Sequence, residues 1–157
     1  MADDAVIVLR GGRVFTPSGF VRGNVIVRGD VIAEVTAASQ EIAGAGIYDA
    51  EGMYVVPGGI DIHIHGGGGH EFVEGTEEAF RTVAASHARH GTTSILPTLP
   101  SCPAETVRRG IDICEKLTSE QDSPVLGLHL EGPYLNPQKT GAMIPEYLKM
   151  PAEEEYR

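Results

Sequence analysis

The feature that most limits the fold of this chain is an alternation of strand-like and helix-like segments that begins near Pro57. Runs of β-branched residues predict three strands, and amphipathic spacing predicts two helices between them. The predicted strands are 60–65, 92–96 and 125–130, with helices over 76–90 and from residue 103 onward. Strands that helices connect in this way pair in parallel, with right-handed crossovers. We therefore predict an α/β fold for residues 57–157.

Each predicted helix has its own start signal and apolar stripe. Thr76 can cap the first helix, and Pro103 suits the first turn of the second. The residues predicted to face the core are Phe80, Val83, Ala84 and His87 in the first helix, and Val107, Ile111, Cys114 and Leu117 in the second. Pro97 is expected to stop the middle strand, because proline lacks the N–H that a central strand donates.

The segment before this alternation, residues 1–56, lacks helical periodicity and is predicted to form a small β unit. Short apolar runs predict several strands, with a break at Gly11-Gly12 and a hairpin turn at 28–30. A unit of this size with few large apolar side chains is a poor independent folder. The predicted organisation is thus a β domain at 1–56 and an α/β domain at 57–157.

The charge balance excludes two classes of partner. Twelve lysines and arginines against 22 aspartates and glutamates give a formal net charge of −10, whereas nucleic acids and anionic membranes both require a basic face. No apolar run approaches the roughly 18 residues of a membrane span, and Asp3 and Asp4 make the N-terminus unlike a secretory signal. Cys102 and Cys114 are expected to be reduced thiols, which suits a cytoplasmic protein.

Two histidines end the first predicted strand. In the segment DIHIH (61–65), alternate side chains share a face, so the side chains of His63 and His65 begin about 7 Å apart on one face. Parallel sheets build active sites at the carboxyl ends of their strands. The two imidazoles are therefore able to converge on one metal ion, although two histidines packed beside a glycine-rich turn would give the same pattern.

A carboxylate ends the third predicted strand. Glu131 follows His129 in the segment HLEGP (129–133) and shares its face. An unpaired buried carboxylate is costly, so Glu131 needs a cation or a hydrogen-bond donor, and a salt bridge or a loop cap would serve as well as a metal ion. By itself, His129 is more typical of a hydrogen-bonded core residue. Imidazoles and a carboxylate at two strand ends fit a hydrolytic metal site with one position open to water.

Longer segments of the sequence resemble a known family. The segment VPGGIDIHIHG (56–66) is similar to the first barrel strand of the amidohydrolase superfamily, and GLHLEGPY (127–134) with KTGA (139–142) resembles its N-acetylglucosamine-6-phosphate deacetylases. The resemblance implies a small β-sandwich domain followed by the start of a (β/α)8 TIM barrel. Because such a barrel takes about 250 residues, residues 57–157 would hold about three of its β/α units and leave it incomplete.

The resemblance also implies roles for particular residues. Glu131 would be a metal ligand, and His63 and His65 would serve a second metal position, with one or two divalent ions, zinc or iron, as the cofactor. Ala142 and Met143 would contact the sugar phosphate, at a place where the family usually carries Ala-His, so Met143 is a departure. The aspartate that acts as general base and acid would lie beyond residue 157, so no catalytic residue is assigned in this chain.

The implied activity is the metal-dependent hydrolysis of N-acetylglucosamine 6-phosphate to glucosamine 6-phosphate and acetate, a reaction of amino-sugar catabolism. The partner would be this small molecule, and the complete enzyme is expected to be a homo-oligomer. The isolated 157-residue chain is expected to be inactive. Two alternatives remain, namely another amidohydrolase such as a cyclic-amide hydrolase, and a non-catalytic α/β fragment.

Overall fold

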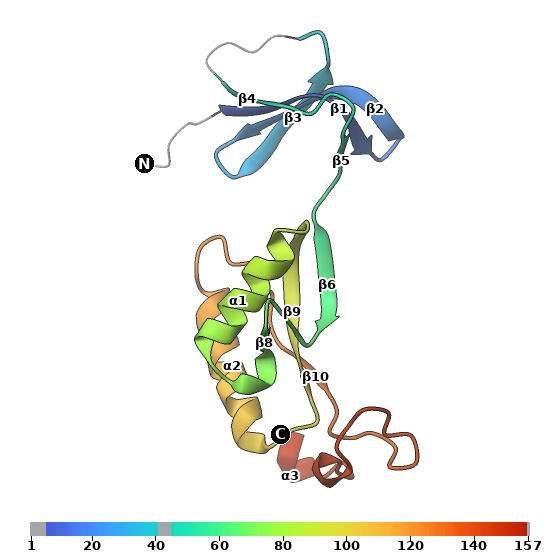
Figure 1. The fold of residues 1–157 in the computed structure, drawn as a ribbon, viewed down its shortest axis with the longest axis vertical. Helices are drawn as coiled ribbons and strands as arrows, with labels where there is room; N and C mark the ends of the chain where they lie inside the picture. The colour runs from blue at the N-terminus through green and yellow to red at the C-terminus, as the bar shows by residue number, and fades with distance from the viewer. Residues whose placement is uncertain (1–5, 41–44, 157) are drawn as a thin grey trace. The chain divides into compact units, whose positions relative to one another are not determined.

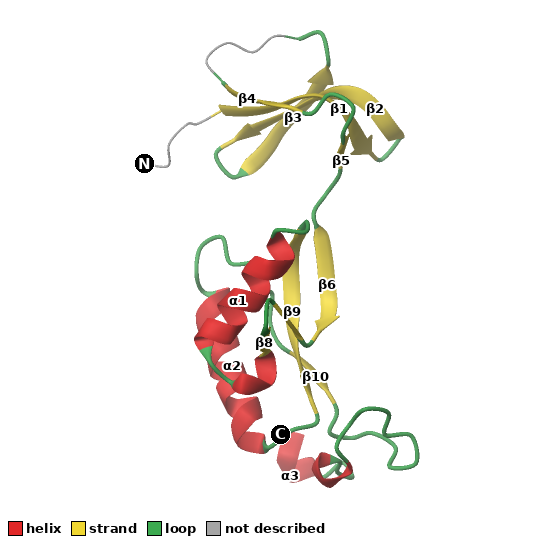
Figure 2. Cartoon of the chain, viewed as in Figure 1, coloured by secondary structure: helices red, strands yellow, loops and turns green. Residues whose placement is uncertain are grey.

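The computed structural model describes residues 6–40 and 45–156 (Figure 1). The chain divides into two compact units, Met1–Pro57 and Gly58–Arg157, with a boundary one residue from the position expected from the sequence. All helices of the described residues belong to the second unit (Figure 2). Within the described residues, no helix combines the length and the apolar composition that crossing a bilayer requires.

The first unit forms one five-stranded sheet in the order β3-β2-β1-β4, with β5 paired to β1. Its strands are β1 (Val6–Thr16), β2 (Gly19–Arg28), β3 (Val31–Ala37), β4 (Gly46–Asp49) and β5 (Tyr54–Val55). A sandwich requires a second sheet facing this one, so the β-sandwich assignment stays a prediction.

Glycines set two local features of this sheet. The expected hairpin is confirmed, because Arg28 pairs with Val31 in an antiparallel ladder and Gly29 takes the positive φ of 60° that the tight turn needs. The expected break at Gly11-Gly12 is wrong. β1 is continuous there, and its pairing with β2 shifts between Leu9 and Gly12, because Gly11 at φ 75° lets the extra residues bulge out of the ladder.

The second unit is built on a parallel sheet in the order β10-β9-β6. The elements are β6 (Gly59–Ile64), β7 (Gly66–Gly67), β8 (His70–Glu71), η1 (Phe72–Glu74), α1 (Glu77–Ala88), β9 (Thr92–Pro100), α2 (Ala104–Thr118), β10 (His129–Glu131), η2 (Pro145–Tyr147) and α3 (Glu153–Tyr156). Thr76 caps α1 as predicted, accepting a hydrogen bond from the Ala79 amide at 3.2 Å. The α/β character predicted for this part of the chain is confirmed.

The core of the second unit lies between this sheet and the helices α1 and α2, which run beside β9 in Figure 1. Its buried members come from the strands, the helices, η1 and the segment before β10, and they are Ile64, Phe72, Phe80, Val83, Ala84, Ile95, Leu99, Cys114, Leu117 and Val125. The rings of Phe72 and Phe80 meet edge to face at 4.8 Å. This packing fixes β6 and β9 and thereby the positions of their carboxyl ends.

Two strand boundaries differ from the prediction. β9 does not stop at Pro97 but continues to Pro100. Pro97 pairs with Ile64 where the β6–β9 register shifts, so the ladder is irregular at the position where an N–H is missing. The third strand is shorter than predicted, because Val125 makes only an isolated bridge to Ile95 and regular pairing begins at His129.

The predicted buried stripe of α2 is confirmed at Cys114 and Leu117 and is wrong at Ile111. Ile111 is 47% exposed, whereas Gly110 is buried. An added Cβ at Gly110 would lie 2.7 Å from Leu99 Cδ1, so the glycine allows α2 to approach β9 closely. Successive residues are about 100° apart around a helix, and turning Gly110 toward the sheet therefore turns Ile111 away from it.

The two cysteines, both unpaired, give a prediction about thiol reactivity. Burial raises the pKa of the Cys114 thiol to about 11, and it also raises the pKa of Cys102, which is only partly buried. The thiolate is the reactive form, and a pKa near 11 leaves only about one Cys114 in a thousand ionised at pH 8. We expect dithionitrobenzoate at pH 8 to label Cys102 first and Cys114 only on unfolding. A Cys114→Ala variant should keep the fast phase, and equal labelling rates would contradict the prediction.

Candidate metal centre

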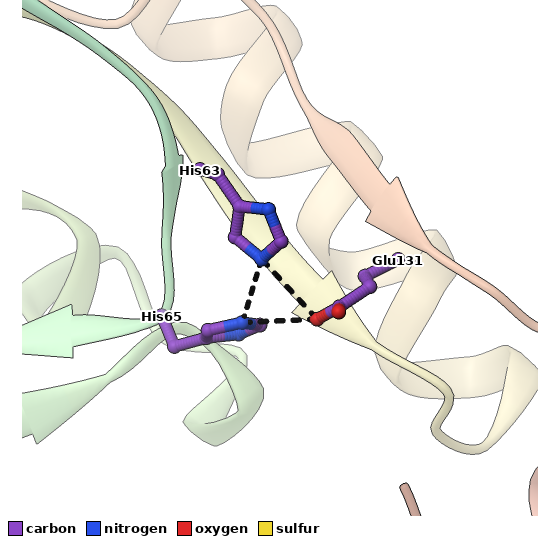
Figure 3. A group of neighbouring side chains, drawn as sticks. All are labelled: His63, His65 and Glu131. Carbon is purple, nitrogen blue, oxygen red and sulfur yellow. Dashed lines mark hydrogen bonds and ion pairs between the residues drawn. The ribbon is translucent and has the colours of Figure 1, made fainter. Parts of the chain in front are cut away.

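Three side chains from two strand ends converge at the carboxyl edge of the parallel sheet (Figure 3). His63 lies in β6, His65 directly follows it, and Glu131 is the last residue of β10. His63 Nε2 lies 3.1 Å from His65 Nε2 and 3.3 Å from Glu131 Oε2, and His65 Nε2 lies 3.1 Å from that same oxygen. The structure thus brings together all three residues that the sequence suggested as metal ligands.

The strand geometry explains why these side chains meet. His63 and His65 are two residues apart in the extended chain at the end of β6, so both imidazoles project to one face. Glu131 pairs with Pro100 at the last position of β9, the strand that separates β6 from β10. Parallel pairing aligns the carboxyl ends of all three strands, and long side chains then reach across β9 from both sides.

The spacing of the three atoms fits a bound cation. Zinc takes nitrogen and oxygen ligands at about 2.0 to 2.2 Å in a tetrahedron, which sets neighbouring ligand atoms about 3.3 to 3.6 Å apart. The observed separations of 3.1 to 3.3 Å are within a few tenths of an ångström of that range. The three atoms converge on one point instead of pairing off, which favours a metal site over the separate salt bridge or glycine-turn packing that the sequence left open.

The three side chains are accessible. His63 and His65 are 47% and 44% exposed, and Glu131 is 31% exposed. A hydrolytic metal site needs this access, because water or substrate must occupy the remaining ligand position. Three convergent side chains with an open side match that requirement.

The turn after Glu131 depends on glycine. Gly132 has φ 105°, and a Cβ at this position would lie 2.1 Å from Ser101 Oγ. Any larger residue would therefore collide with Ser101, directly after β9, while adopting a backbone conformation that residues with side chains rarely adopt. Gly132 lets the chain leave β10 immediately after its carboxylate.

A cavity of about 590 Å³ adjoins the centre. Its lining includes two of the three convergent residues and the loop after β10, and it consists of His65, Glu71, Val73, Pro100, Glu131, Leu135, Lys139, Thr140, Gly141, Ala142 and Met143. The structure therefore places Ala142 and Met143, the expected sugar-phosphate contacts, in one cavity with His65 and Glu131. Sequence reasoning missed Glu71 and Val73, because nothing in their local pattern marks them as neighbours of a loop 70 residues later.

His129 is held as a hydrogen-bonded residue, in keeping with the interpretation favoured from sequence. Its Nδ1 lies 3.2 Å from the hydroxyl of Thr98, and its ring meets the ring of His63 edge to face at 4.9 Å. Thr98 is fully buried on β9. Thr98 lies opposite His129 in the β9–β10 register, a relation that only the strand pairing reveals.

The other histidines lie outside the centre. His70 Nδ1 is 3.0 Å from Glu74 Oε2, and hydrogen bonds from the Glu71 amide and then from His70 lower the pKa of Glu74. His87 Nε2 lies 3.2 Å from the carbonyl oxygen of Gly66, so it supports the glycine turn. None of these histidines belongs to the convergent group found among the described residues.

Residues 54–157 match the model of the amidohydrolase family. The chain is 32% identical over 126 residues to the N-acetylglucosamine-6-phosphate deacetylase of Haemophilus influenzae, an alignment that covers 80% of this chain and 33% of the relative. It is 34% identical over 147 residues to the human protein of the same name, with 90% of this chain and 35% of the relative covered.

A solved structure agrees with these matches. The crystal structure of N-acetylglucosamine-6-phosphate deacetylase from Pasteurella multocida superposes with a TM-score of 0.89 at 26% identity, covering 96% of this chain and 40% of that one. The chain thus spans about a third of the length of the two curated relatives.

Proposed function

The chain belongs to the amidohydrolase family, and from this premise we propose that it carries part of the active site of a metal-dependent deacetylase. The proposed reaction adds water to the acetamide of N-acetylglucosamine 6-phosphate and yields glucosamine 6-phosphate and acetate. The observation that carries the proposal is the convergence of His63, His65 and Glu131 beside the cavity that residues 139–143 line. The β–α–β–α–β order of the second unit suits the first part of a (β/α)8 barrel.

In this proposal, His63, His65 and Glu131 hold one or two divalent ions, either zinc or iron. Neutral imidazole and carboxylate suit both metals. Such an ion lowers the pKa of a bound water and polarises an amide carbonyl. Glu131 supplies the one negative charge among the three ligands, and its Oε2 lies within 3.3 Å of both imidazoles.

The cavity lining supports a substrate with both apolar and anionic parts. Val73, Leu135 and Met143 offer apolar surface, while Lys139 is the one lysine or arginine among the lining residues and forms no ion pair with another described residue. Met143 carries a thioether, which donates no hydrogen bond to a phosphate. We therefore assign the sugar phosphate's charge to Lys139 and its less polar surface to Ala142 and Met143.

The proposal predicts a substrate preference. The preference is tested on the complete enzyme, expressed from the gene that encodes this chain. With zinc present, we expect acetate release from N-acetylglucosamine 6-phosphate, much slower release from N-acetylglucosamine, and no hydrolysis of hydantoin or dihydrouracil. Acetate is measured by a coupled enzymatic assay, and excess chelator should stop its release. Faster hydrolysis of a ring amide would replace this proposal with the cyclic-amide alternative, and absence of any metal-dependent hydrolysis would favour the non-catalytic one.

The isolated 157-residue chain belongs in the same assay as a separate arm. We expect it to bind zinc but to release no acetate, because its described residues supply metal ligands without an assigned general base. Metal-dependent turnover by this chain would contradict that expectation while supporting the deacetylase. A homo-oligomeric state and a cytoplasmic location stay predictions from the sequence.

A further inference from the structure

Thr98 occupies a central position beneath the metal centre. It lies in β9, the middle strand of the parallel sheet, with β6 on one side and β10 on the other. Its side chain is fully buried, and its hydroxyl contacts both neighbouring strands. A hydroxyl group thereby connects the two strands that supply the convergent residues.

The Thr98 hydroxyl adds hydrogen bonds at an irregular point of the β6–β9 ladder. The Ile64 amide donates to Thr98 Oγ1 at 3.0 Å, and Oγ1 lies 3.1 Å from the Leu96 carbonyl oxygen. Ile64 pairs with Pro97 next to a shift in the β6–β9 register. The hydroxyl therefore holds the backbone amide between His63 and His65 at an irregular point of the ladder.

The same hydroxyl determines where the proton of His129 lies. A hydroxyl has one proton to donate and two lone pairs to accept with. The Leu96 carbonyl accepts only, and the Ile64 amide donates only. The hydroxyl therefore uses its proton on Leu96 and one lone pair on Ile64. Its second lone pair can accept a hydrogen bond from His129 Nδ1, 3.2 Å away, if Nδ1 carries the proton. Neutral His129 then has an unprotonated Nε2, and its ring stands edge to face against His63 at 4.9 Å.

We propose that Thr98 is a positioning residue for the metal centre, because its hydroxyl fixes the backbone between His63 and His65 and holds His129, as its Nδ1–H tautomer, against His63. The inference rests on the proposed function only in requiring that these histidines bind a metal ion. Groups that orient metal ligands from behind alter metal affinity by about 10- to 100-fold when they are removed. Thr98 acts only indirectly, through the backbone and through a neighbouring ring. We therefore expect its removal to weaken metal affinity by about tenfold, the lower end of that range.

The test compares Thr98→Val, which removes the hydroxyl at nearly constant shape, with Thr98→Ser, which retains it. Zinc affinity of the 157-residue chain is measured by competition with a chromophoric chelator. The tautomer of His129 is read from long-range proton–nitrogen correlation spectra at a pH where the ring is neutral. Thr36→Val is the matched control, because Thr36 is also a buried strand threonine of the first unit, and its hydroxyl donates to a backbone carbonyl 3.4 Å away.

We expect Thr98→Val to bind zinc about tenfold more weakly and to lose the preference for the Nδ1–H tautomer, with Thr98→Ser and Thr36→Val close to wild type. Unchanged zinc affinity in Thr98→Val would overturn the inference and leave the proposed function intact. A wild-type chain without zinc affinity would instead contradict the proposed function, and this inference with it. If Thr98→Val does not fold, the wild-type spectrum still decides, since an Nε2–H tautomer of His129 would refute the assignment.

Discussion

Glu131→Gln is expected to abolish the stabilisation of the second unit by zinc. Wild-type chain in zinc at a hundred times its dissociation constant should gain about 2.7 kcal/mol in the free energy of unfolding. Glutamine keeps the size of the side chain but removes the only negative charge among the three convergent groups. A neutral amide oxygen between two imidazoles is a much weaker ligand, so we expect no measurable gain. Chemical unfolding with zinc and with excess chelator, followed by circular dichroism at 222 nm, measures the difference.

Glu71→Gln is the matched control for this prediction. Glu71 lines the same cavity as Glu131 but lies outside the convergent group. The same change of charge there should leave the zinc-dependent gain close to the wild-type value. If Glu131→Gln were stabilised by zinc as strongly as Glu71→Gln, zinc would be binding somewhere other than the proposed centre.

The second large effect concerns the core that supports the centre. Leu117→Ala is expected to lower the free energy of unfolding of the second unit by about 2–5 kcal/mol, as truncation of a buried leucine does. Leu117 is 2% exposed and belongs to the cluster between the helices and the sheet. Its loss would leave a cavity in this cluster, because the close-packed neighbours relax only partially into the space.

Ile111→Ala provides the contrast on the same helix. Ile111 is 47% exposed, so its truncation should cost no more than about 0.5 kcal/mol. Both variants are measured by urea unfolding at 222 nm, where the signal comes from the helices of the second unit. If both variants lost a similar free energy of unfolding, Ile111 would be buried, as the periodicity of the sequence predicts and contrary to the structure.

Strand parity is the reason that the metal ligands could be found without a structure. His63 and His65 are two residues apart in a β-branched segment, and Glu131 ends another. Side chains alternate along any strand, so the two histidines share a face regardless of what the strand packs against. The rule that parallel strands align their carboxyl ends then brings Glu131 to the same edge.

Helix periodicity was less reliable, and α2 shows why. Val107, Ile111, Cys114 and Leu117 form an acceptable apolar stripe by spacing alone. Cys114 and Leu117 are buried, but Ile111 is exposed, because Gly110, which has no side chain, faces Leu99 and lets α2 approach β9 closely. A contact with a side chain on another element decided the orientation, and such contacts are invisible to a pattern within one helix.

The sequence by itself determined the strand–helix order, the shared face of His63 and His65, and the placement of Glu131 at a strand end, because these follow from local backbone geometry. Only the tertiary structure decided that the three side chains lie within 3.3 Å of one another, that residues 139–143 line their cavity, and that Thr98 connects their strands. These relations join segments that lie far apart in the chain. Their distances depend on the register between strands and on core packing, which local sequence patterns do not encode.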